Sequence, residues 1–280
     1  MDIIKKILHL DRRIIFLTLF IVLLITPFIH LEMKINITNP TRRIFNDVEE
    51  MSEGDPIIVS MSYAPFAKPE LYPMTLAFLR HCCMKKLRII FVATNEAGMS
   101  IAIQAMEEIK MEFEYEHGKD YVLLAFNPVL SAVMLGMGES ITDIFPEDYY
   151  GNKTKGLKVL KDVNDYRDIK LLMDFSAGDS PVWWVVYANT RYNQRIGTGV
   201  TAVMAADFYP YLNTGQMIGL INGLKGAAEY ETLINHTAEA TEKMTSQAIA
   251  HIVIILFILI GNIAYFIDKR NKRKERHGTA

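Results

Sequence analysis

The stretch Pro56-Ile57-Ile58-Val59-Ser60-Met61 is apolar at nearly every position. A strand with one face in solvent alternates apolar and polar residues, whereas a short continuous apolar run is typical of a strand buried on both faces. Similar runs occur at Leu87–Val92, Tyr121–Phe126 and Ile169–Phe175, and a fifth strand is expected at Gly199–Met204. These runs predict the strands of a buried, mostly parallel sheet.

Helical patterns separate the first strands. Pro69–Lys86 and Gly98–Phe113 carry apolar residues at spacings of three and four, as expected for amphipathic helices. Another helix is expected after Ser180-Pro181, a pair typical of a helix start. Alternating strands and helices predict an α/β domain, Rossmann-like or flavodoxin-like, with a mostly parallel sheet. The order of its strands cannot be read from the sequence.

Two apolar segments, residues 14–31 and 248–267, are each about long enough to cross a bilayer. Positive side chains precede the first and follow the second: Lys5, Lys6, Arg12 and Arg13, then Lys269, Arg270, Lys272, Arg273, Lys274 and Arg276. The positive-inside rule then places both termini in the cytoplasm and the main domain on the other side of the membrane. A cleaved signal peptide is the alternative for the first segment.

The predicted organisation has six parts, and the largest is an extracytoplasmic domain. They are a cytoplasmic N-terminus (1–13), transmembrane helix 1 (14–31), the α/β domain (32–228), a juxtamembrane helical stalk (229–247), transmembrane helix 2 (248–267) and a basic cytoplasmic tail (268–280). Residues 1–31 and 248–280 carry +2 and +4, so in a chain of net charge −2 the part between them is −8. An acidic domain of this kind is not expected to bind nucleic acid.

Polar side chains follow the predicted strands, where ligands bind in open α/β sheets. We expect a candidate ligand-binding crevice there, formed by Ser60, Tyr63, Asn95, Glu96, Asn127, Asp174, Ser176 and Asp179. The alternative is structural, because serine, asparagine and aspartate also cap helices and form turns in such loops.

Motifs for cofactors and catalysis are missing from the sequence. It has no G-x-G-x-x-G after the first strand, no G-x-x-x-x-G-K-[ST] and no G-x-S-x-G. Its seven histidines have no ligand spacing, and the adjacent Cys82 and Cys83 are expected to be buried apolar residues. We therefore predict no cofactor, no metal and no catalytic residues, with a cation site on Asp174 and Asp179 as an alternative.

Small residues recur every four positions near the end of the domain, at Gly215, Gly219, Gly223 and Ala227. On a helix they would form a smooth stripe that permits close packing of a second helix. We expect this stripe to pack either inside the domain or in an interface between copies or with a partner membrane protein. A loop in which the glycines form a ligand-binding turn is the third alternative. From Glu229 the helix is expected to continue without a break into the second apolar segment.

Together these features predict a two-pass, non-enzymatic structural or assembly subunit of a homo-oligomeric or larger membrane complex. Its expected partners are the lipid bilayer and either further copies or another membrane protein. The alternative is an extracytoplasmic module that binds or senses a small ligand. A hydrolase or transferase using Ser60, Asp174 or Asp179 is less favoured, because no general base can be assigned.

Overall fold

The computed structural model describes residues 11–26, 35–127 and 129–278. Its contacts divide the chain into two units, Met1–Lys34 with Glu242–Ala280, and Ile35–Thr241. The second unit is the α/β domain, and the first contains the apolar helices.

Among the described residues, one helix is long and apolar enough to cross a membrane. This stretch, Glu239–Arg270, belongs to α12 (Glu239–Gly278), whose large apolar side chains are exposed. The first predicted span is described only as α2 (Arg12–Ile25), a helix of 14 residues with exposed apolar side chains; residues 27–31 lie outside the described part of the chain.

A six-stranded, all-parallel sheet forms the centre of the domain. Its strands are β1 (Pro56–Ser62), β2 (Arg88–Ala93), β3 (Tyr121–Leu123), β4 (Leu171–Ser176), β5 (Ile196–Val200) and β6 (Gly219–Asn222). Their order, β3-β2-β1-β4-β5-β6, is that of a doubly wound Rossmann-like fold. The predicted α/β class and parallel sheet are confirmed.

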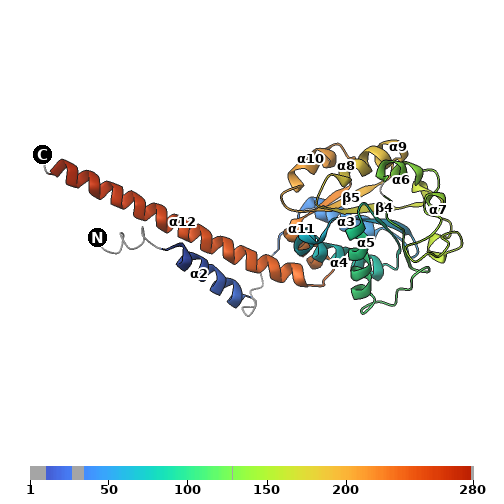
Figure 1. Ribbon diagram of the computed structural model, residues 1–280, viewed down its shortest axis with the longest axis horizontal. Coiled ribbons are helices and arrows are strands. Elements are labelled where there is room, and N and C mark those ends of the chain that lie inside the picture. The colour runs from blue at the N-terminus through green and yellow to red at the C-terminus, as the bar shows by residue number, and fades with distance from the viewer. Residues whose placement is uncertain (1–10, 27–34, 128, 279–280) are drawn as a thin grey trace. The chain divides into compact units, whose positions relative to one another are not determined.

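Helices cover both faces of the sheet (Figure 1). One face carries α3 (Asn39–Glu49), α4 (Lys68–Met84), α5 (Glu96–Ile109) and α11 (Gly223–Leu233). The other carries α6 (Leu130–Gly136), α7 (Ile141–Ile144), α8 (Ser180–Trp184), a π-helical turn η5 (Val185–Asn189), α9 (Thr190–Tyr192) and α10 (Ala205–Asn213). Short 3-10 turns lie at Pro65–Ala67 (η2), Lys158–Leu160 (η3) and Tyr166–Asp168 (η4).

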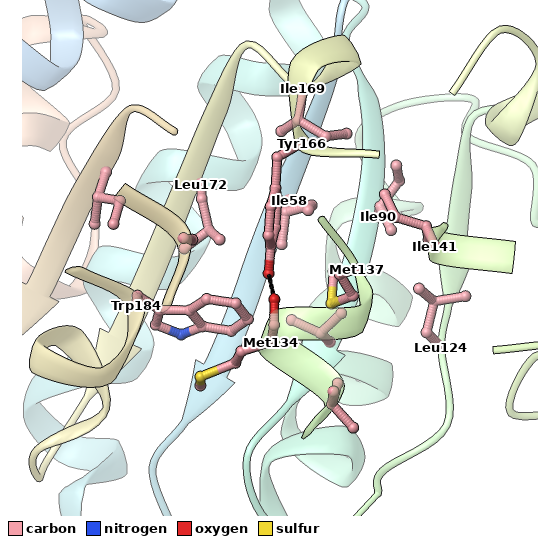
Figure 2. Close-up of a cluster of buried hydrophobic side chains, with 14 of the residues drawn as sticks. Ile58, Ile90, Leu124, Met134, Met137, Ile141, Tyr166, Ile169, Leu172 and Trp184 are labelled. Carbon is pink, nitrogen blue, oxygen red and sulfur yellow. Dashed lines mark hydrogen bonds between the residues drawn. The ribbon is translucent and has the colours of Figure 1, made fainter. Parts of the chain in front are cut away.

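The second of these faces buries a large apolar cluster. Ile58 of β1, Leu172 of β4 and Trp184 of α8 are members (Figure 2). Tyr166 brings a polar atom into the cluster, and its hydroxyl donates to the carbonyl of Met134 over 2.6 Å. This bond satisfies a buried group that would otherwise be costly, and the face therefore forms a closed core.

The glycine-spaced segment is not one helix, so this prediction is wrong. Gly215 lies in a turn at φ +77°, Gly219 begins β6, and Gly223 begins α11 at φ +55°, so that only Ala227 lies well inside a helix. Positive φ is the conformation that favours glycine. Gly219 packs inside the domain, where an added Cβ would lie 2.5 Å from the Pro40 carbonyl oxygen. The helical stripe from which we expected an oligomer interface is therefore not present.

The unbroken stalk is also wrong, because α11 ends at Leu233 and α12 begins at Glu239. Asn235 lies between them at φ +53°. The buried Glu231 carboxylate accepts hydrogen bonds from the backbone N–H groups of Ala238, Ala240 and Thr241, at 2.9 to 3.0 Å. A side chain of α11 therefore caps the first turn of α12, whose N–H groups have no partners within the helix.

Replacement of Gly219 by alanine tests its packing. The new Cβ would meet Ile44 and the Pro40 carbonyl, each at 2.5 Å, so we expect Gly219→Ala to lower the free energy of unfolding by about 1–3 kcal/mol. Thermal unfolding followed by circular dichroism measures this loss. Gly178→Ala is the matched control, because its Cβ would meet nothing within 4 Å. Equal melting temperatures for the two variants would contradict the packing.

Candidate functional site

A fully buried carboxylate, Asp174 of β4, lies near the carboxyl edge of the sheet. Ser62 donates its hydroxyl to Asp174 Oδ1 over 2.5 Å, and Ser180 donates to Oδ2 over 2.6 Å. Each carboxylate oxygen therefore has its own hydroxyl donor. These donors compensate part of the cost of removing the carboxylate from water.

Further hydrogen bonds extend this network across the point where the strand order reverses. Ser60 lies opposite Asp174 in the β1–β4 register, and its hydroxyl is 3.0 Å from that of Ser62. The indole Nε1 of Trp184 donates to Ser60 Oγ over 3.1 Å, and the Ser176 and Ser180 hydroxyl oxygens are 2.8 Å apart. We call these six residues, 60, 62, 174, 176, 180 and 184, the Asp174 network.

Burial raises the pKa of Asp174 to about 6, against the lowering effect of the hydroxyls of Ser180 and Ser62. Asp174 and Ser60 have no exposed surface. A general base must reach the proton that it removes, and this carboxyl group is in contact with the protein's own hydroxyls. The network is therefore organised as a structural element.

The structure brings together three of the eight predicted crevice residues, Ser60, Asp174 and Ser176. Tyr63 is buried, with its hydroxyl 3.0 Å from that of Thr75 in α4. Asn95 caps α5 by accepting a hydrogen bond from the Gly98 N–H over 2.7 Å.

The remaining three predicted residues are not members of the network, although Asp179 directly precedes Ser180 in the chain. Asn127 accepts a hydrogen bond from the backbone N–H of Val129 over 3.0 Å, as in a turn. Glu96 and Asp179 are exposed. Asn95 and Asn127 thus have the capping and turn roles of the structural alternative.

Three residues of the Asp174 network, Ser62, Ser180 and Trp184, are not among the eight predicted crevice residues. The sequence predicts Ser180 only as part of a helix start, and it gives no role to Trp184. The available signal was chemical, because an aspartate inside a buried apolar strand requires donors. Which donors reach it depends on the pairing of β1 with β4, which the sequence does not reveal.

A hollow of about 380 Å³ opens at the carboxyl edge, and none of the predicted crevice residues lines it. It lies among the connections that follow β1, β4 and β5, and we call it the switch-point hollow. Its lining residues are Phe66, Ala67, Pro69, Glu70, Ala177, Thr201, Val203 and Met204. Phe66 is 78% exposed and Val203 is 86% exposed. Large apolar groups therefore face solvent where a ligand-binding domain of this fold places polar groups.

A second hollow, of about 460 Å³, is lined by Val129, Leu130, Ser131, Trp183 and Tyr187. Tyr187 belongs to η5, the π-helical turn, and such turns occur frequently at functional sites. Trp183 is 41% exposed. Like the switch-point hollow, this site exposes apolar rather than catalytic groups.

The described part of the chain assembles no metal-binding cluster, and its two cysteines are buried. No cluster of three His, Cys, Asp or Glu side chains there is arranged to hold a metal ion. Cys82 and Cys83 are buried, and burial raises the pKa of both thiols, that of Cys83 to about 12. The reactive thiolate form is therefore suppressed at neutral pH.

Comparisons with known proteins add no relative. No family model matches the chain, and neither a curated protein nor a solved structure matches it. The strand order thus defines the class: a Rossmann-like α/β domain, with one helix among the described residues that has the length and composition of a membrane span.

The ionisation of Asp174 predicts a pH-dependent stability term. Its pKa is raised to about 6 in the folded protein, against about 4 when unfolded. Asp174 contributes about 3 kcal/mol to the free energy of unfolding below pH 4, and this contribution is lost as the pH rises through 6. Asp174→Asn removes this contribution. The free energy of unfolding of the variant should therefore increase relative to that of the parent as the pH rises from 4 to 6. Urea unfolding from pH 4 to 8 measures the difference.

Asp179→Asn is the matched control for this measurement, because it makes the same substitution at an exposed position and keeps the buried Asp174 carboxyl group, so it should retain the loss of stability between pH 4 and 6. Other titrating groups are the same in all three proteins and cancel in the comparison. A difference between Asp174→Asn and the parent that stays constant with pH would contradict the raised pKa.

Proposed function

We propose that this protein is a membrane-anchored, non-enzymatic assembly subunit whose α/β domain binds a partner protein through the carboxyl edge of its sheet. One observation carries the proposal. At this edge the buried polar groups are bonded to one another in the Asp174 network, while Phe66 and Val203 expose apolar surface.

The exposed apolar groups favour a protein as the occupant of the switch-point hollow. Buried aromatic residues commonly contribute much of the binding energy at protein interfaces. Phe66 projects from the short turn after β1, and Val203 projects from the connection after β5. Leaving both in water is costly for an isolated domain, and a partner that covers them removes this cost.

The charge around the hollow favours a partner over a second copy of this chain. Glu96, Asp179 and Asp207 are exposed at the starts of the helices that follow β2, β4 and β5. Lys68 also lies here, but its ammonium group binds Gln104 and lies over the Tyr72 ring. Two copies meeting through this edge would bring like charges together. We therefore propose a partner with an apolar segment between basic residues.

The membrane part of the proposal combines the structure with the charge pattern. The stretch Glu239–Arg270 has the length and composition of a spanning helix. Cations follow it, and cations also flank the first apolar segment. We propose two spans, with both termini in the cytoplasm and the α/β domain outside.

Site-specific photocrosslinking in the native membrane tests the docking edge. A photoreactive phenylalanine analogue at position 66 or 203 should crosslink to one membrane-associated protein. The crosslinked peptide, identified by mass spectrometry, should contain an apolar segment with basic neighbours. Position 111 is the control, because Met111 is equally exposed (81%) but lies beyond the end of α5.

Substitution then separates docking from chance proximity. Phe66→Asp combined with Val203→Asp should reduce recovery of that partner by about tenfold or more, as expected for the loss of buried apolar anchors. Met111→Asp should have no such effect. Crosslinks that join only copies of this chain, or that form equally from position 111, would refute the proposed partner.

Cysteine labelling in intact cells tests the topology. Cys82 and Cys83 are buried with raised pKa values, so the parent should react little with a membrane-impermeant maleimide. Ser100→Cys, exposed on α5, should react from outside, whereas Lys5→Cys and Lys274→Cys should react only after lysis. Labelling of position 274 in intact cells would overturn the orientation, and labelling of position 5 would overturn the two-pass arrangement.

A further inference from the structure

A buried histidine, His81 of α4, connects α4 to α3 and α11. Its ring is 1% exposed and stacks on Phe45 of α3, with the ring centroids 4.7 Å apart. Nδ1 lies 2.9 Å from the hydroxyl oxygen of Tyr230 in α11, and Nε2 lies 3.0 Å from Glu49 Oε1 at the end of α3. We call His81, Glu49 and Tyr230 the His81 contact. Both ring nitrogens have partners, and the ring bonds α11 to α3.

The partners select one form of the ring. Against the effect of burial, His81 and Lys85 lower the pKa of Glu49, so this side chain is a carboxylate and only accepts hydrogen bonds. The ring proton is therefore on Nε2, and Nδ1 accepts from the Tyr230 hydroxyl. Burial raises the pKa of Tyr230 well above its ordinary value, so the hydroxyl keeps its proton. The geometry thus favours a neutral imidazole.

Two charged groups face the ring among the described residues, Glu49 and Lys85. The Lys85 ammonium group donates to the Glu49 carbonyl over 2.7 Å and lies 3.4 Å from Oε2, so part of the negative charge is already paired. Two carboxylates at the end of α5 and just after it pair with Arg80 instead, and burial raises the pKa of the neighbouring Cys82 thiol, which stays neutral. Burial consequently lowers the pKa of His81, although Glu49 acts to raise it.

A second proton on the ring would conflict with Tyr230. Protonated histidine donates from both nitrogens and accepts at neither. Nδ1–H would then meet the hydroxyl oxygen, and the proton of the fully buried Tyr230 hydroxyl would lose its acceptor. An unpaired buried donor is costly. Separation of α4 from α11 removes this cost, because water can then bind both groups.

The lowered pKa of His81 sets the direction of the effect. The folded protein binds the second proton less readily than an exposed histidine does, so the neutral ring stabilises the contact above the ordinary pKa of about 6.5. This stabilisation is lost as the pH falls.

The residue that follows Tyr230 holds the start of α12. Glu231 is 1% exposed, and its carboxylate caps the backbone N–H groups of Ala238, Ala240 and Thr241. Tyr230 and Glu231 are consecutive residues of α11, so movement of this helix away from α4 displaces both. Opening of the His81 contact would therefore also release the cap.

We propose that the His81 contact is an acid-sensitive joint, which holds α11 and the capped start of α12 while the ring is neutral and releases them when it is protonated. The joint responds below about pH 7, where histidine gains its charge. It requires neither the proposed partner nor the proposed membrane topology.

Hydrogen exchange of the full-length protein in detergent micelles, followed by mass spectrometry, tests the joint. The readout is the protection of residues 234–241, corrected for the intrinsic exchange rate at each pH. Between about pH 7.5 and 5.5, protection in the parent should fall by about threefold to tenfold relative to His81→Gln, which cannot take up the proton. Tenfold is the limit for a ring whose pKa is about 6.5 in the open form.

Matched variants locate the effect. His117→Gln and His236→Gln make the same substitution outside the His81 contact and should retain the fall in protection. Glu49→Gln, at a side chain that is 47% exposed, keeps an acceptor for Nε2–H but removes the charge that stabilises the protonated ring. Its protection should therefore fall at least as far as that of the parent.

Since His81 is buried, circular dichroism must show that His81→Gln is folded, and Glu49→Gln provides an independent variant. Equal pH dependence of the parent and folded His81→Gln would overturn the proposal. So would a smaller fall in Glu49→Gln than in the parent, or loss of the fall in His117→Gln.

Discussion

The burial of one carboxylate, Asp174, is the constraint on which this domain's organisation depends. An aspartate inside a sheet is tolerated only where donors replace the water that it has lost. Here the donors come from β1 and from the start of α8, and Trp184 supports them through Ser60. The network therefore joins two strands and a helix at the point where the strand order reverses. It also fills with the protein's own side chains the region in which related architectures hold a ligand.

Because these polar groups are bonded to one another, the fold does not by itself indicate the function of the domain. The strand order alone would favour a nucleotide or another cofactor, yet function depends on the groups that a domain leaves available. At the carboxyl edge the available groups are apolar, with Phe66 and Val203 the most exposed. At the amino edge the exposed groups include the charged side chains of Lys170 and Arg195. The two edges thus differ in chemistry, and the apolar one is where we propose that a protein binds.

The fold was predictable where apolar runs are long and uninterrupted, and β1, β2 and β4 lie where those runs are. β6 was not predicted, because its four residues begin with Gly219 and lie where glycines recur every four residues, a spacing that is typical of one face of a helix. The fifth strand lies earlier than expected, at Ile196–Val200, since its two glycines weaken the apolar signal. In the site, Ser60, Asp174 and Ser176 were predicted as polar residues at the ends of strands, and the structure places all three within β1 and β4. Trp184 could not be, because its contact with Ser60 requires the pairing of strands far apart in sequence.

The cap that Glu231 provides has a mechanical consequence. The first turn of α12 is bonded to a buried side chain of α11, so a helix with the length and composition of a membrane span begins at residues that the domain itself holds. A pull on α12 would load these hydrogen bonds before it could extend residues 234–238. Several bonds to one carboxylate share that load and must break nearly together. If α12 spans the membrane as proposed, a force along it would be resisted first by these hydrogen bonds, and residues 234–238 could extend only after the cap is lost.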